Sequence, residues 1–267
     1  MHGRQITRLF SSLLLFPALM ASAETRPCEA ESGPNRVALL ELYTSEGCSS
    51  CPPADAWLSR LEGQGITMDK LVPLSLHVDY WNYIGWRDPY SSAQYTARQR
   101  EVGQRNRLRS IYTPQMVLNG RDYRGWRGGD IHRQVTAVNN QPAAATIQLK
   151  WSESGEGAQS SLSIKLRAEL NAEQAIAQPV VHIALFENHL VSHVDAGEND
   201  GRSLKHDYVV RRLFNYPFAD GRRVFSRQFS LPMNKDWDRD ALGLAVFVQD
   251  SRRGEVLQAM AQAIDCK

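Results

Sequence analysis

Two cysteines three positions apart place the strongest constraint on the fold of this chain. Cys48 and Cys51 form a C-x-x-C motif, which follows the apolar run Val37–Tyr43 after a short loop. Pro52 and Pro53 come directly after the motif, and proline is tolerated only in the first turn of a helix. We therefore expect a buried strand, then a turn that holds both cysteines, then a helix that opens at the two prolines.

The residues that follow continue this alternation of strands and helices. Asn119-Gly120 is typical of a two-residue β-hairpin turn. Asp88 before Pro89, and Asp130 before an apolar stripe, are typical of helix N-termini. The predicted order is strand, helix, strand, helix, strand, strand, helix. The later elements are a strand at Leu71–Val78, a helix from Asp88 to about Gln104, strands at Met116–Leu118 and Asp122-Tyr123, and a helix after Asp130 with Ile131, Val135 and Val138 on one face.

The second half of the chain shows little helical periodicity. A linker-like stretch, residues 139–145, precedes it, so we expect a boundary between a domain at 36–140 and a second at 141–267. Short runs separated by turn residues favour a β-sandwich for the second domain. The predicted strands are Thr146–Lys150, Leu162–Ala168, Val180–Phe186, Tyr208–Phe214, Arg223–Leu231, Leu242–Gln249 and Glu255–Ala261.

The first 23 residues have the pattern of a signal peptide. Arg4 and Arg8 precede an apolar run, and Ala21-Ser22-Ala23 matches a signal-peptidase site. The apolar run is shorter than the roughly 20 residues that span a bilayer, so we expect no membrane insertion after cleavage. Residues 24–35 then form an N-terminal segment. The protein is predicted to be periplasmic or secreted.

The charge balance argues against nucleic acid as a partner. The chain has 31 Lys and Arg residues against 29 Asp and Glu residues, and loss of Arg4 and Arg8 leaves the two equal. General nucleic-acid binders carry an excess of positive charge that neutralises phosphates.

All four cysteines, Cys28, Cys48, Cys51 and Cys266, lie after the predicted cleavage site. An oxidising compartment favours disulfides, and four cysteines allow three pairings. Cys48 and Cys51 are close enough to pair locally. Cys28 and Cys266 lie near the two ends of the mature chain, which are often close in space. We predict Cys48–Cys51 and Cys28–Cys266, the latter as a structural disulfide; the alternative is that Cys28 or Cys266 acts as a resolving thiol.

The order of elements and several motifs resemble known families. A C-x-x-C at a helix start, followed by Thr113-Pro114 before a hairpin, resembles the thioredoxin pattern. ELYTSEGCSSCPPAD (41–55), HVDYWN (77–82), YTPQMVLNG (112–120) and GENDGRSLKHDYVVR (197–211) are similar to the secreted proteins of the domain-of-unknown-function family numbered 1223. The resemblance implies an α/β thioredoxin-like domain followed by an all-β, sandwich-like C-terminal domain. It also implies a cis bond at Pro114 that faces Cys48, and it assigns no reaction.

A cysteine at the start of a helix is activated by its surroundings. Unpaired backbone N–H groups and the helix dipole stabilise its thiolate and lower the thiol pKa from about 8.5. Cys48 is the expected nucleophile and Cys51 the resolving thiol, with protein or small-molecule thiols and disulfides as partners. The motif alone is equally typical of an inert disulfide or of half a zinc site.

Three further groups are candidates for the same site. Glu41 stands in an apolar strand and is either a buried general base for Cys51 or a residue that points outward or pairs with an arginine. Trp81 and Trp86 follow the second strand, and with Thr113 they are candidate substrate-binding residues. Nine arginines between positions 98 and 133, against three acids, either line a groove beside the cysteines or form a solvated helix face.

No metal site and no cofactor is predicted. His77 and Asp79 can approach the cysteines, but loop hydrogen bonding explains both. Four later histidines lack acids or cysteines at ligand spacing and are interpreted as surface residues: His182, His189, His193 and His206. The leading hypothesis is thus an exported thiol–disulfide oxidoreductase. The alternative is a non-catalytic envelope binding protein with a structural C-x-x-C disulfide.

Overall fold

The computed structural model describes residues 28–155, 160–171 and 176–265. Across these ranges it contains three α-helices and fourteen β-strands. The helices are α1 (Pro52–Ser59), α2 (Ala93–Arg105) and α3 (Ile131–Asn139). The strands are β1 (Cys28–Glu31), β2 (Ala38–Thr44), β3 (Leu71–His77), β4 (Gln115–Leu118), β5 (Arg121–Asp122), β6 (Ala145–Ser154), β7 (Ser161–Leu170), β8 (Pro179–Glu187), β9 (Leu190–His193), β10 (Ser203–His206), β11 (Val209–Pro217), β12 (Val224–Pro232), β13 (Leu242–Asp250) and β14 (Val256–Ala263).

The local signals in the first half gave the predicted order of elements. Asn119 and Gly120 both adopt positive φ, as a two-residue hairpin between β4 and β5 requires. The Asp130 side chain accepts from the backbone of Arg133 and caps α3. The predicted start of α2 at Asp88 is wrong, because Ser92 caps this helix and the Asp88 carboxylate is buried among other polar groups.

The two halves of the chain share one sheet. Its eight strands run in the order β14-β13-β8-β11-β3-β2-β4-β5, with parallel pairing at β11–β3 and β3–β2 and antiparallel pairing elsewhere. The junction lies at the β11–β3 pair, where Val209 is in register with Ser75 and the Ser75 N–H donates to the Tyr208 carbonyl. The predicted fold class, a thioredoxin-like α/β domain followed by a separate β domain, is wrong. The described chain is mostly β and its halves are continuous through this sheet.

Two hydrophobic cores lie on opposite faces of the C-terminal strands. A four-stranded sheet, β1-β6-β7-β12, packs against one face of β8 and β13. Residues alternate between the faces of a strand, so Ile183 and Leu185 of β8 enter this core while Ala184 and Phe186 enter the core of the first half. Burial on both faces explains why β8 and β13 are continuous apolar runs in the sequence.

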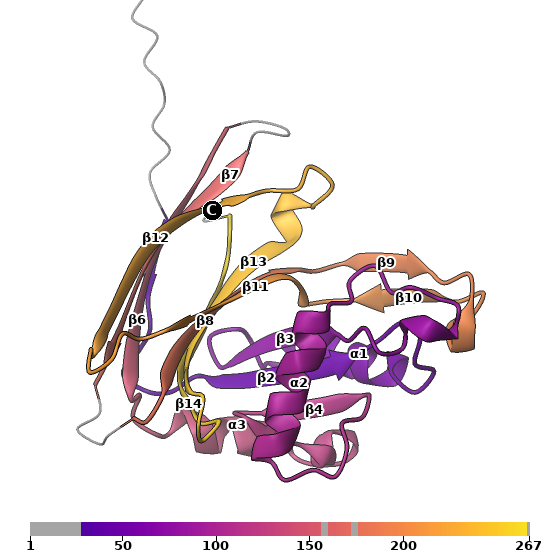
Figure 1. Cartoon of the computed structure of the whole chain (residues 1–267), viewed down its shortest axis with the longest axis horizontal. Coiled ribbons are helices and arrows are strands. Elements are labelled where there is room, and N and C mark those ends of the chain that lie inside the picture. The colour runs from indigo at the N-terminus through magenta and orange to yellow at the C-terminus, as the bar shows by residue number, and fades with distance from the viewer. Residues whose placement is uncertain (1–27, 156–159, 172–175, 266–267) are drawn as a thin grey trace, which may run out of the picture.

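A two-stranded ribbon made of β9 and β10 extends from the second half over the first. Figure 1 shows the ribbon reaching across the end of the molecule that carries α1, and β10 packs against this helix. The sequence predicted neither this ribbon nor β1. The ribbon brings residues 197–206 to the cysteines and so completes the candidate site.

Some predictions concern segments outside the described ranges. The predicted signal peptide lies there, and so does Cys266, so the pairing with Cys28 stays a prediction. In the described part of the chain, no helix has the length and apolar character needed to cross a membrane.

Candidate functional site

Cys48 and Cys51 are joined by a disulfide, as predicted. The cysteine turn, residues Cys48–Cys51, is closed by a hydrogen bond from the Cys51 N–H to the Cys48 carbonyl, 3.1 Å long. Cys51 is the N-cap residue of α1, and its carbonyl accepts from Ala54 at 2.8 Å. The helix opens at Pro52, as predicted, and Cys48 lies in the turn before it, so the nucleophile expected at the helix start stands three residues ahead of the N-cap position.

Both cysteines are covered. Cys48 is 1% exposed and Cys51 0%, whereas the intervening Ser49 and Ser50 lie at the surface. On one side Gly47 packs under Trp81, and a Cβ at Gly47 would lie 3.2 Å from that of Trp81. A thiol or disulfide partner therefore meets the two serines first, and contact with sulfur needs a local movement.

The loop between β9 and β10 covers the other side of the cysteine turn. The buried Asn199 amide donates to the carbonyls of Glu46 and Cys48, at 2.7 and 3.0 Å. Arg202 donates to the Asn199 side-chain oxygen at 2.6 Å and fixes the amide orientation. Glu198 accepts from the Ser49 N–H at 2.9 Å, and hydrogen bonding to the Ser49 side chain and to this N–H lowers the pKa of the Glu198 carboxyl. The second half of the chain thus holds the cysteine turn through side chains on backbone groups.

The predicted cis bond at Thr113–Pro114 is confirmed. Thr113 and Pro114 line a cavity of about 360 Å³ together with Ser50, so they lie beside the cysteine turn. The Trp81 indole donates to the Thr113 hydroxyl at 2.8 Å, which joins two of the predicted substrate-binding residues. The cavity is lined by Ser50, Tyr112, Thr113, Pro114, Arg124, Trp126 and Arg127.

Glu41 is buried, and it is paired with an arginine. Its Oε1 lies 2.5 Å from Arg98 Nε and accepts from the Tyr43 hydroxyl at 3.0 Å. Burial favours a neutral guanidine, but the Glu41 carboxylate outweighs it and raises the pKa of Arg98. The polar contacts of Glu41 among the described residues are with α2 and β2, and none of them is with a cysteine. The arginine-partner alternative is the arrangement observed.

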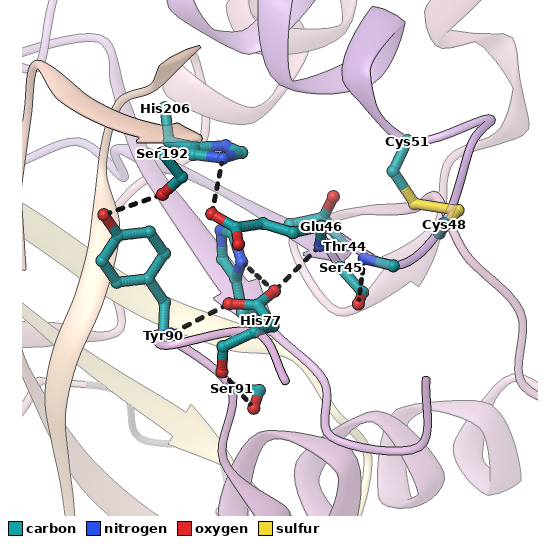
Figure 2. A network of polar contacts seen from close by, with 12 residues as sticks. Thr44, Ser45, Glu46, Cys48, Cys51, His77, Tyr90, Ser91, Ser192 and His206 are labelled. Carbon is teal, nitrogen blue, oxygen red and sulfur yellow. Dashed lines mark hydrogen bonds and ion pairs between the residues drawn. A yellow bond between two sulfur atoms is a disulfide. The ribbon is translucent and has the colours of Figure 1, made fainter. Parts of the chain in front are cut away.

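Five ionisable side chains meet beside the cysteine turn, from the loop after β2, from α1, from β3, from the segment before α2 and from β10. We call them the acid–histidine cluster: Glu46, Asp55, His77, Asp88 and His206. Figure 2 labels Glu46, His77 and His206 of this cluster, next to the cysteine turn. All five are nearly inaccessible to solvent.

His206 lies between two acids of this cluster. Its Nδ1 forms a hydrogen bond with Asp55 Oδ1 at 3.3 Å. Its Nε2 lies 3.3 Å from Glu46 Oε1, and this contact is an ion pair without the alignment of a hydrogen bond. His77 Nδ1 donates to Asp88 Oδ2 at 2.7 Å. Trp86, a predicted substrate-binding residue, instead donates to Glu46 Oε2 at 2.7 Å.

The cluster has three carboxyl groups and two histidines, and this balance shifts the pKa values of His206 and Asp88. Burial opposes the charged form of His206, yet its polar contacts with the Asp55 and Glu46 carboxylates and their negative charges raise its pKa to about 10. Burial also opposes ionisation of Asp88, and the charge and hydrogen bond of His77, with two backbone N–H groups, leave its pKa lowered. The site thus concentrates negative charge around the histidines.

The interpretation of four histidines as surface residues is wrong for two of them. His206 is 2% exposed and His182 5%, whereas His189 and His193 are exposed. His182 stacks on Phe247, and burial lowers its pKa well below the ordinary value, with Arg98 adding to the effect. No local sequence signal marks His206 as buried, since β10 is four residues long and two of its residues are exposed.

Comparison with known proteins places the chain in a family. The model of a family described as "Protein of unknown function (DUF1223)" matches residues 39–249. The chain belongs to the DUF1223 family. The match runs from β2 to β13, and so it includes the cysteine turn and the whole acid–histidine cluster. No curated protein matches this DUF1223 chain.

Two solved structures are similar to this DUF1223 protein over most of its length. One is a structural-genomics target from Agrobacterium tumefaciens, 27% identical, with a TM-score of 0.58 over 87% of this chain and 96% of that one. The other is HBP35 of Porphyromonas gingivalis, 12% identical, with a TM-score of 0.64 over 88% of this chain and 77% of that one. The second likeness concerns the fold alone.

Proposed function

We propose that this protein carries out thiol–disulfide exchange through Cys48 and Cys51, in the periplasm or outside the cell. The observation that carries the proposal is the Cys48–Cys51 disulfide at the N-terminus of α1, next to a cavity that Ser50 shares with Thr113 and Pro114. Unpaired N–H groups at a helix start stabilise a nearby thiolate, which makes the disulfide easier to open.

The reaction exchanges two electrons between two dithiol–disulfide pairs. In the reduced protein the Cys48 thiolate attacks a substrate disulfide, forms a mixed disulfide and releases one substrate thiolate. The Cys51 thiolate then attacks Cys48 Sγ, closes the protein disulfide and releases the second substrate thiolate. The released thiolates take up the two protons that the cysteines lost, and the reverse sequence oxidises a substrate dithiol.

The cavity beside the cysteine turn suits a substrate with acidic or aromatic character. Arg124 lines it while paired with Asp122 at 2.8 Å. Arg127 lines it with a positive charge, and Trp126 supplies an apolar surface. Arg127 lies over the Trp126 ring at 4.9 Å and keeps this pair together. Protein or small-molecule thiols and disulfides of the envelope are the proposed partners.

A second candidate function rests on the burial of the sulfurs. Cys48 and Cys51 are almost wholly inaccessible, and the Asn199 amide fixes the backbone around them. This supports a structural disulfide in a non-catalytic binding protein of the envelope, because exchange requires access to sulfur. The two functions differ in what the separate cysteines do.

Single cysteine variants separate the two functions. Cys51→Ser keeps the attacking thiol and removes the resolving one, so it should accumulate mixed disulfides with envelope proteins. Cys48→Ser should accumulate far fewer. Each variant is captured from an envelope fraction without reductant and eluted with it, with Cys48→Ser/Cys51→Ser as the control for non-covalent capture. Absence of reductant-sensitive partners for Cys51→Ser, in a folded protein, would contradict exchange and favour the structural disulfide.

A further inference from the structure

We propose that the acid–histidine cluster binds one divalent transition-metal ion, most favourably zinc, through Glu46, Asp55, His77 and His206. The site is independent of the exchange chemistry proposed above, because it contains no sulfur ligand. Donor atoms of Asp55, His77 and His206 all lie within 4.8 Å of one another. Glu46 is not one of these three residues, but its Oε1 lies 3.3 Å from His206 Nε2, and we assign it as the fourth donor.

Three of the proposed ligands, His77, Asp55 and Glu46, each have a second polar side-chain atom. That atom forms a hydrogen bond with a residue that is not itself a ligand. His77 Nδ1 is bound to Asp88 at 2.7 Å, Asp55 Oδ2 accepts from Thr44 at 2.9 Å, and Glu46 Oε2 accepts from Trp86 at 2.7 Å. Outer partners of this kind orient metal ligands and fix the histidine tautomer. With Nδ1 on Asp88, His77 directs Nε2 to the centre of the cluster.

Several inward atoms lack a hydrogen bond. Among the described residues, His77 Nε2 has no hydrogen-bond partner in a residue that is 0% exposed, and a buried polar atom of this kind destabilises the fold unless something satisfies it. In the same part of the chain, His206 Nε2 and Glu46 Oε1 contact only each other, as an ion pair at 3.3 Å without hydrogen-bond alignment. A bound cation would accept a lone pair from each of these three atoms and would displace the proton that His206 otherwise shares with the acids.

The charges of the cluster also favour a cation. Glu46, Asp55 and Asp88 bring three carboxylates together, and among the described residues none of the three forms an ion pair with a lysine or arginine. Their ion-pair partners are His77 and His206. A divalent ion balances this charge without requiring that either imidazole be protonated.

The donor set selects the class of ion. Two imidazoles with two carboxylates suit zinc, whereas calcium and magnesium prefer oxygen ligands alone. Tetrahedral ligands at about 2.0–2.1 Å from zinc lie about 3.4 Å apart. The side chains therefore close by roughly an ångström around the ion. Bound there, the ion would join β10 to α1 and to the loop before Cys48.

The test uses the full mature chain with its disulfides oxidised. The protein is treated with a chelator, dialysed and titrated with zinc chloride, and bound zinc is counted by elemental analysis. One zinc per chain is expected, with X-ray absorption showing nitrogen and oxygen ligands and no sulfur. Failure to retain zinc at micromolar concentration, or a sulfur ligand in the absorption spectrum, would overturn the site.

Variants locate the ion. His77→Gln and His206→Gln should each weaken zinc binding by more than about 100-fold, a larger loss than the 10–100-fold typical of outer-shell changes. The matched control is His193→Gln, which alters an exposed histidine of the same ribbon and should bind as the unmodified chain does. Cys48→Ser/Cys51→Ser should also retain the zinc. Normal binding by a folded His206→Gln protein, or loss of zinc in the cysteine variant, would contradict the proposal. Should a histidine variant fail to fold, the absorption spectrum of the unmodified chain still decides.

Discussion

Two buried charged groups on opposite faces of β2 differ in how their charge is compensated. Glu41 and Tyr43 point to the α2 face, where Arg98 supplies the countercharge to Glu41. Thr44 points to the α1 face and donates to Asp55, at the edge of the acid–histidine cluster. That cluster has three carboxylates and two histidines, and among the described residues no lysine or arginine forms an ion pair with it.

The difference separates a stabilising pair from a binding site. The Glu41 carboxylate has one guanidinium to balance its charge, and loss of that partner affects stability. Both sites contain a buried carboxylate oxygen without a hydrogen bond, Glu41 Oε2 and Glu46 Oε1, so the difference lies in the charge balance. Three carboxylates matched only by two imidazoles are able to take up a cation. The cysteine turn lies beside the second group and is held by the same ribbon.

The largest expected effect comes from breaking the Glu41–Arg98 pair. Arg98→Met leaves a buried carboxylate without its partner and should lower the free energy of unfolding by about 3–5 kcal/mol. Urea unfolding followed by circular dichroism measures it. Glu41→Gln/Arg98→Met should recover part of the loss, and Arg100→Met, at an exposed position of α2, should change it by less than about 0.5 kcal/mol. A loss below about 1 kcal/mol for Arg98→Met would show that the pair is not a main support of this face.

Release of the ribbon from the cysteine turn should have an intermediate effect. Asn199→Ala removes three side-chain hydrogen bonds and leaves the Glu46 and Cys48 carbonyls without this donor, so we expect a loss of about 1–3 kcal/mol. The Cys48–Cys51 disulfide should also be reduced faster by dithiothreitol, since its cover is loosened. Asp200→Ala, at the exposed neighbouring position, is the control. Unchanged reduction kinetics in Asn199→Ala would mean that the loop does not limit access.

A pH titration tests the charges around the α2 face. The pKa of His182 is lowered in the folded chain by burial and by Arg98 and Arg105, so below about pH 6.5 the unfolded chain binds a proton that the folded chain does not. Stability should therefore fall with falling pH, at a limiting slope of about 1.4 kcal/mol per pH unit from this group. His182→Gln should reduce the slope between pH 6.5 and 5 relative to the unmodified protein. Equal slopes in the unmodified protein and His182→Gln would contradict the assignment.

The smallest effect is expected at Glu198, on the surface of the ribbon loop. Its contact with the Ser49 N–H is exposed, and solvent-exposed interactions add little to stability. Glu198→Gln should leave the urea midpoint unchanged and speed disulfide reduction less than Asn199→Ala does. A larger acceleration than that of Asn199→Ala would place the control of access at the surface contact.

Local chemistry made much of the fold predictable. The hairpin at Asn119-Gly120 and the cap at Asp130 depend on neighbouring residues alone, and both formed as expected. The apolar runs of β8 and β13 also predicted strands. Their continuity was a sign of burial on both faces, which the interpretation as a separate sandwich overlooked. The joining of the halves at Val209 and Ser75 is a long-range pairing with no local signal.

The candidate site was predictable only in part. The Cys48–Cys51 disulfide and the cis bond at Pro114 followed from short motifs. Glu46 and His206 are 160 positions apart in sequence, and their meeting depends on the β9–β10 ribbon, whose strands are four residues each. Short strands with exposed polar residues resemble loops in sequence, so the acid–histidine cluster was not foreseen.

The redox equilibrium of Cys48 and Cys51 with glutathione tests the exchange proposal most directly. The protein is equilibrated in buffers of defined reduced-to-oxidised glutathione ratio, quenched with acid, alkylated and analysed by peptide mass spectrometry. An exchange centre should titrate with a potential between about −270 and −120 mV, the range of known exchange proteins. A pair that stays oxidised throughout and has a potential below about −300 mV would be a structural disulfide and would contradict the account.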